Sequence, residues 1–172
     1  PSQEDLSFLR MFYRLGVRYL TLTHAASNQI CDSCTSKEPV WHGVSPFGRK
    51  VIEECNRLGI MIDVSHISDE AFWDVIKYSK APVVASHSCC RALCGHPRNM
   101  TDEMIIAMAE KGGVIQITLC PKFLTDEYRL SVGTLGDDFD EADYAWRPDQ
   151  SNPVLQQRLK EALEAYAAVP LP

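Results

Sequence analysis

The sequence predicts an α/β fold built on a parallel sheet, and three observations support this class. Short apolar segments rich in β-branched residues alternate with longer segments whose apolar residues have helical spacing. The short segments are apolar along most of their length, as buried parallel strands usually are. The later connections each have room for one helix, the unit that joins parallel strands by a right-handed crossover. We therefore expect about four parallel strands with intervening helices.

The expected elements follow one another along most of the chain. In order, we predict a helix over residues 4–16, a strand over 17–24, a helix over 46–59, a strand over 60–65, a helix over 68–80, a strand over 82–86, a helix over 101–113 and a strand over 114–119. Start signals support the helices, because Ser45 precedes Pro46 and Ser68 precedes two acidic residues. Glycines close three of the helices.

The alternation stops after the last of these strands. Residues 120–151 predict a long acidic loop, and loops of this length are usually functional or poorly ordered. Residues 152–168 predict an amphipathic helix, with Asn152 as its cap and Pro153 in its first position. We treat residues 1–172 as one segment of a single domain.

The composition excludes nucleic acid as a partner and gives no sign of a membrane segment. A net charge of −6 provides no basic surface for phosphate groups. No apolar run approaches the roughly 18 residues that span a bilayer. The chain does not start with a basic region followed by an apolar one, so we expect no signal peptide in it. The compartment stays open, because a parent protein could be cytoplasmic or exported.

The seven cysteines are expected to be reduced thiols. Their number is odd and the chain is not small, which argues against a disulfide framework. Residues 31–34 form a CxxC motif, but no second pair of cysteines or histidines accompanies it. We therefore interpret this motif as part of a loop rather than as a redox or zinc site.

Three of the five histidines stand at the ends of consecutive predicted strands, namely His24, His66 and His87. The carboxyl ends of parallel strands share one rim, so these side chains are expected to meet there. Neighbouring strands lie about 4.8 Å apart, which lets His66 and His87 reach one ion. We interpret this pair as ligands of a divalent metal, zinc before others, because neutral imidazole is a favoured zinc ligand. The alternative is a pair of hydrogen-bonded core histidines.

His24 and Arg98 are candidates for contacts with a substrate. The strand of His24 is displaced from the other two, which favours a substrate-binding or electrophilic role over a structural one. Arg98 lies on the loop that leaves the His87 strand, where its guanidinium could clamp a carboxylate with two hydrogen bonds. The alternative for Arg98 is a surface position. His42 and His96 have no strand-end position and are interpreted as loop residues.

These features together resemble the membrane (renal) dipeptidase family of zinc peptidases. The resemblance is carried by GVRYLTLTH, GVSPFGRKVIEECNRLGIMIDVSHIS, APVVASHS and the Arg-Asn pair at 98–99, in the family's order and spacing. It covers residues from about 5 to 124. It implies an amidohydrolase-like (β/α)8 barrel of the TIM type, of which this chain holds about four strands, with two zinc ions at the carboxyl rim.

The resemblance also implies roles for the candidate residues. His66 and His87 would ligate the second zinc ion. His24 would contact the scissile carbonyl or its oxyanion, and Arg98 would receive the C-terminal carboxylate of a small dipeptide. A hydroxide that bridges the two ions would attack the peptide bond. A homodimer is compatible with the sequence.

Departures from the family pattern indicate a central fragment of the catalytic barrel. The family's His-x-Asp for the first zinc, its bridging glutamate and its catalytic aspartate have no counterpart here. Phe123 stands where the family can have a tyrosine near the substrate carboxylate. Because four strands cannot close an eight-stranded barrel, we expect dipeptidase activity in a parent enzyme and an inactive segment by itself.

Two other functions stay open on the sequence alone. Another amidohydrolase-type metal hydrolase, acting for instance on a lactone, would share the metal site and differ in contacts such as His24 and Arg98. A catalytically inactive barrel used for binding would account for the missing ligands.

Overall fold

A computed structural model gives the fold of the chain and describes residues 5–133 and 150–168. Its strands are β1 (Tyr19–Thr21), β2 (Met61–Asp63), β3 (Val84–Ser88) and β4 (Val114–Ile117). All pair in parallel in the order β1-β2-β3-β4, which confirms the predicted α/β class and the four strands. The strand β3 begins two residues later than predicted, since Pro82 has no N–H to give to a ladder.

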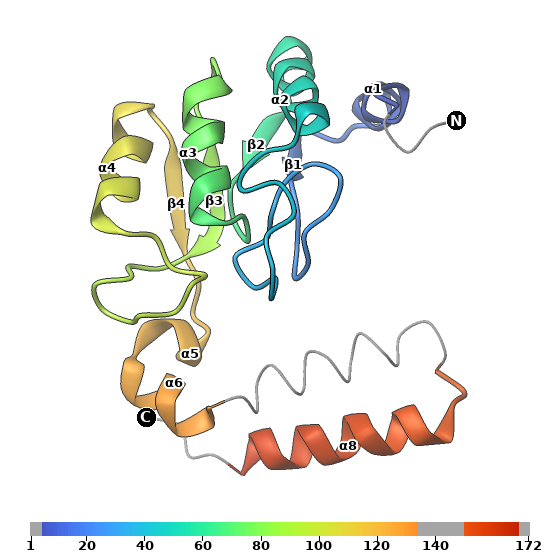
Figure 1. The fold of residues 1–172 in the computed structure, drawn as a ribbon, viewed down its shortest axis with the longest axis vertical. Coiled ribbons are helices and arrows are strands. Elements are labelled where there is room, and N and C mark those ends of the chain that lie inside the picture. The colour runs from blue at the N-terminus through green and yellow to red at the C-terminus, as the bar shows by residue number, and fades with distance from the viewer. Residues whose placement is uncertain (1–4, 134–149, 169–172) are drawn as a thin grey trace.

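The predicted helices between the strands are also present. They are α1 (Ser7–Arg14), α2 (Pro46–Leu58), α3 (Asp69–Tyr78) and α4 (Asp102–Glu110). The hydroxyls of Ser45, Ser68 and Thr101 cap the last three, each accepting a backbone N–H from three residues further on. Figure 1 shows α2, α3 and α4 side by side along the sheet, with the strand arrows pointing to one common end.

The two faces of the sheet have different surroundings. Ile62 and Ala85 belong to the buried core together with apolar residues of α2, α3 and α4, and each is 1% exposed. Tyr19, Met61 and Val114 are more than half exposed, and Tyr19 is the register partner of Met61. Because successive side chains alternate between faces, the described helices cover one face and leave the other accessible.

The segment after β4 differs from the prediction of a continuous loop. Two short helices occupy its first part, α5 (Pro121–Leu124) and α6 (Asp126–Val132). They form because Phe123 and Tyr128 bury their rings and Thr125 caps α6 through its hydroxyl. The acidic centre, residues 134–149, lies outside the described residues. The final helix is present as predicted, as α8 (Pro153–Ala167), with Asn152 accepting N–H groups at its start.

Two further features concern the cysteines and the helices. All seven cysteines are free, and the CxxC motif lies in a loop. Burial raises the pKa of Cys31 to about 12 and also raises that of Cys34, so neither thiol ionises readily. Across residues 5–133 and 150–168, no helix combines the length and the apolar character needed to cross a membrane.

Candidate functional site

The three strand-end histidines meet at the carboxyl rim, as predicted. The ring centroids of His24 and His66 lie 4.2 Å apart, and those of His66 and His87 lie 4.8 Å apart. The Nε2 atoms of His66 and His87 are separated by 2.7 Å. His24 is exposed, whereas the other two rings are partly buried. The rim therefore has an inner pair of imidazoles and one outer imidazole stacked on it.

Both inner imidazoles are neutral near pH 7. Burial lowers the pKa of His66 to about 3, and the positive charge of Arg98 is the next cause. Burial, followed by Arg98, also lowers the pKa of His87. A neutral imidazole keeps a lone pair on one ring nitrogen, which is the form that ligates a metal. The pair therefore offers nitrogen ligands without first losing protons to the solvent.

The backbone at His66 has an unusual conformation that aims its side chain. Its φ angle is 75°, in the left-handed region that residues with a Cβ rarely adopt. The N–H of Cys34 donates to the carbonyl oxygen of His66 at 2.8 Å and holds this turn. Backbone strain of this kind concentrates at functional sites. Here it turns the chain just after β2, where the imidazole faces His87.

The donor set fits part of a metal site. Two neutral imidazoles on neighbouring strands, with facing Nε2 atoms, match the chemistry of zinc ligands. Catalytic zinc sites use three protein ligands. Within the described part of the chain, no three or more His, Cys, Asp or Glu side chains are grouped to hold a metal ion. The described residues thus offer two candidate ligands and no complete site.

Arg98 is buried beside the histidines, which argues against the alternative of a surface arginine. Arg98 is only 6% exposed, and its Nη2 donates a hydrogen bond to the carbonyl oxygen of His87 at 3.1 Å. Its Cζ lies 5.6 Å from the ring centre of Phe123. None of the ion pairs between described residues involves Arg98. Because a buried cation without an anion is costly, this position favours an anionic ligand.

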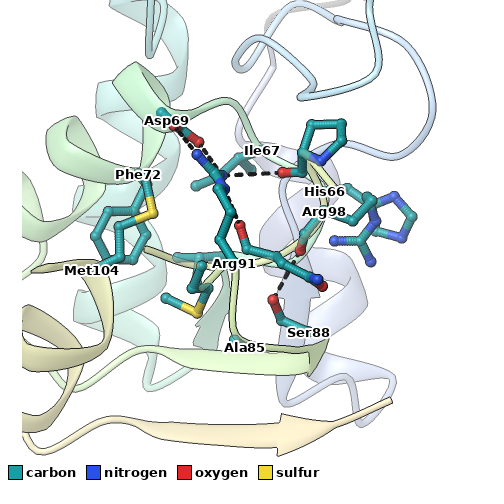
Figure 2. Close-up of a pocket in the computed structure, with 13 residues that line it drawn as sticks. His66, Ile67, Asp69, Phe72, Ala85, Ser88, Arg91, Arg98 and Met104 are labelled. Atoms are coloured by element: carbon teal, nitrogen blue, oxygen red, sulfur yellow. Dashed lines mark hydrogen bonds and ion pairs between the residues drawn. The ribbon is translucent and has the colours of Figure 1, made fainter. Parts of the chain in front are cut away.

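A second arginine, Arg91, holds the loop that carries Arg98. Its guanidinium donates to both carboxylate oxygens of Asp69, at 2.5 and 2.8 Å. It also donates to the carbonyl oxygens of Pro97 and Asn99. Figure 2 shows Arg91 reaching Asp69 on one side of the loop, while Arg98 and His66 lie on the other. The loop is thereby tied to the first turn of α3.

We expect Arg91→Ala to destabilise the protein by about 1–2 kcal/mol, because it removes charged hydrogen bonds that solvent only partly screens. Urea unfolding of the native full-length chain measures this cost. Arg129→Ala is a matched control, since Arg129 also pairs with an aspartate, Asp126, but within one short helix. An equal loss of unfolding free energy in the two variants would show that the Arg91–Asp69 pair contributes no more than an ordinary surface ion pair.

His96 also supports the Arg98 loop, which its loop position alone does not reveal. Its ring lies 4.4 Å from that of Phe123, and its Nδ1 accepts the backbone N–H of Arg98 at 3.0 Å. Burial lowers the pKa of His96 to about 4, so the ring stays an acceptor. His42 is an exposed loop residue, as predicted.

A buried carboxylate next to the histidines was not identified from the sequence. Asp63 is 0% exposed, and its carboxylate accepts hydrogen bonds from Thr21, Ser65 and Ser86. Burial opposes its ionisation, but these hydrogen bonds outweigh burial and lower the pKa of Asp63. The available signal was an acidic residue inside an otherwise apolar strand, two residues before a Ser-His pair.

Comparison with known sequences gives a consistent group of relatives. A model of the family described as membrane dipeptidase (peptidase family M19) matches residues 2–144. Dipeptidase tcpJ of Claviceps purpurea is 46% identical over 115 residues, which cover 67% of this chain and 27% of that protein. Dipeptidase 3 of Homo sapiens is 42% identical over 140 residues, which cover 79% of this chain and 29% of that protein. The chain thus spans less than a third of the length of these relatives.

Solved structures with the same fold come from longer chains as well. The probable dipeptidase PvdM from Pseudomonas aeruginosa has a TM-score of 0.75 and 29% identity, over 97% of this chain and 46% of that one. A metallo peptidase from Rhodobacter sphaeroides, liganded with a phosphinate mimic of the dipeptide L-Ala-D-Ala, has a TM-score of 0.68 and 27% identity. That match covers 95% of this chain and 43% of the other.

Proposed function

We propose that the carboxyl rim of the sheet forms part of a zinc-dependent dipeptidase site, because this chain belongs to the membrane dipeptidase family (peptidase family M19). One observation carries the proposal, namely the pair of neutral, facing imidazoles beside a buried guanidinium that no described carboxylate pairs with. A metal ligand pair and an anion receptor lie side by side, which suits a substrate that has a peptide bond next to a free carboxylate. The activity belongs to the whole protein, of which the described rim supplies one portion.

His66 and His87 are the proposed zinc ligands on this chain. The family includes metallopeptidases, so a metal ion is expected, and the two imidazole nitrogens make zinc the best match. A bound zinc ion would supply polarisation of the scissile carbonyl and a lowered pKa for the attacking water. Further ligands have to come from outside the described residues, because these contain no group of three.

Arg98 is proposed to bind the C-terminal carboxylate of the substrate. Its guanidinium is buried, its Nη2 is held on the carbonyl oxygen of His87, and the ring of Phe123 lies beneath it. This anchoring leaves a planar fork suited to a carboxylate. The Rhodobacter sphaeroides relative is liganded with a phosphinate mimic of the dipeptide L-Ala-D-Ala, which supports a dipeptide as the substrate class here.

His24 is proposed to contact the substrate carbonyl. It is exposed at the outer edge of the cluster, stacked on His66 at a centroid distance of 4.2 Å. A ring nitrogen at this place can donate a hydrogen bond to the oxygen that becomes negative when the carbonyl is attacked.

The test is the substrate class that the zinc-loaded native full-length chain hydrolyses. We expect kcat/KM for free dipeptides to exceed that for lactones and for amides without a carboxylate by at least about 100-fold. Removal of metal with a chelator should abolish the activity, and added zinc should restore it. Faster hydrolysis of lactones would identify another metal hydrolase, and no turnover of any substrate would identify a binding barrel. Either result contradicts the proposal.

A further inference from the structure

Both serines of the repeated Ser-His endings contact the same imidazole. The hydroxyl of Ser65, which precedes His66, accepts the backbone N–H of His87 at 3.0 Å. The hydroxyl of Ser86, which precedes His87, lies 2.7 Å from the Nδ1 atom of that ring. His87 is therefore held at its backbone by the turn that follows β2 and at its ring by its own strand, β3. No comparable contact from a serine reaches the His66 ring among the described residues.

Asp63 determines the direction of the hydrogen bond at Ser86. The Oδ1 atom of Asp63 accepts the backbone N–H groups of Ser65 and Ser86, both at 3.0 Å. Its Oδ2 atom accepts the hydroxyls of Thr21 at 2.7 Å and of Ser86 at 2.5 Å. Four donors thus surround the carboxylate, which acts only as an acceptor. The single hydroxyl proton of Ser86 is therefore donated to Asp63.

The direction of the hydrogen bond between Ser86 and the His87 ring then follows. With its proton on Asp63, the Ser86 oxygen can only accept from the Nδ1 atom of His87. The His87 ring therefore carries its proton on Nδ1 and presents an unprotonated Nε2 atom. That Nε2 atom faces His66 at 2.7 Å, which is the direction of the proposed metal. Partners of this kind fix the tautomer and the orientation of ligating histidines.

We infer that Ser86, backed by Asp63, is a positioning residue that presets the Nδ1–H tautomer of His87 and aims its Nε2 atom for metal binding. The inference rests on the proposed function, because it concerns a ligand of the proposed zinc ion. It goes beyond that proposal, because it assigns a role to a serine and an aspartate that touch neither metal nor substrate. Asp63 joins β2 to β1 through Thr21 and to β3 through Ser86. The hydrogen bonds that fix the His87 tautomer are therefore built into the sheet.

Thr21 provides a matched control for Ser86. Both hydroxyls donate to the same oxygen of Asp63, but only Ser86 also reaches the His87 ring. A purely structural role for the cluster predicts similar effects of Ser86→Ala and Thr21→Val. A positioning role predicts that the two variants lower the melting temperature similarly but separate in zinc affinity.

The first measurement is zinc affinity of the native full-length chain in competition with a chromophoric chelator. We expect Ser86→Ala to weaken binding by about 10–100-fold, with Thr21→Val within about threefold of the wild type, because only the former removes the ring's partner. Ser86→Thr keeps the hydroxyl and should restore most of the affinity. Equal losses for Ser86→Ala and Thr21→Val would overturn the inference.

The second measurement needs neither metal nor activity. In the metal-free wild type, ¹⁵N shifts of histidine-labelled protein should show His87 as the Nδ1–H tautomer, with the signal assigned by its absence in His87→Ala. In Ser86→Ala the two tautomers should mix. Finding the Nε2–H form in the wild type would overturn the inference. If instead the wild type shows the expected tautomer but binds no zinc, the proposed function is wrong, whereas the role of Ser86 in fixing the His87 tautomer is supported.

Discussion

Replacing His87 with alanine is expected to remove about one zinc ion per chain from the native full-length protein and to reduce dipeptide hydrolysis by more than about 100-fold. Loss of a ligand should lower metal affinity and activity more than loss of a ligand's hydrogen-bond partner, which typically lowers them by about 10–100-fold. Metal analysis after gel filtration and kcat/KM for a free dipeptide are the two measurements. His66→Ala should behave in the same way, since the two Nε2 atoms face each other at 2.7 Å.

The controls for this pair follow from its backbone. His66 has a φ angle of 75°, where alanine is strained, so His66→Asn is a second variant that tolerates the left-handed conformation. His42 also has a positive φ of 52° but lies on an exposed loop, and His42→Asn should keep full zinc content. Unchanged zinc in both His66 variants or in His87→Ala would show that the ligand assignment is wrong.

Replacing Arg98 with alanine is expected to raise KM for free dipeptides by roughly 30- to 1000-fold, the equivalent of about 2–4 kcal/mol for truncating one partner of a buried charge pair. C-terminal amides of the same dipeptides lack the carboxylate, so their already high KM should change little. Steady-state kinetics on both substrate series gives the comparison. Zinc content should stay at the wild-type value, because Arg98 is not a ligand.

A second substitution separates the charge of Arg98 from its geometry. Arg98→Lys keeps the positive charge but loses the planar fork, so KM for free dipeptides should lie between those of the wild type and Arg98→Ala. The lysine variant also fills the space over the Phe123 ring, so it controls for a loss of stability from the cavity that alanine leaves there. Equal rises in KM for dipeptides and amides in both variants would contradict the role as carboxylate receptor.

The order of strands and helices could be read from the sequence because it depends on local signals. Apolar periodicity located four strands, and Ser45 and Ser68 marked helix starts that the structure reproduces. The short helices α5 and α6 escaped prediction for the opposite reason. Their apolar residues are few, and Phe123 and Tyr128 become core residues only when the segment folds back against the rest of the chain.

The sequence by itself determined which residues gather at the rim. His24, His66 and His87 follow consecutive strands, and parallel strands deliver their carboxyl ends to one edge whatever their exact register. Arg98 could be named as a candidate from its place on the next loop. Its burial could not, because that depends on Phe123 beneath it and on the loop that Arg91 holds.

Only the tertiary structure decided which of these residues touch and in what state. Side chains alternate across a strand, so a register shift of one residue would place Ser86 on the other face, away from Asp63. The left-handed turn at His66 likewise depends on the distant N–H of Cys34. Local sequence specified the elements and the rim, while strand register and long-range hydrogen bonds specified the contacts of His87 and thus the tautomer we infer.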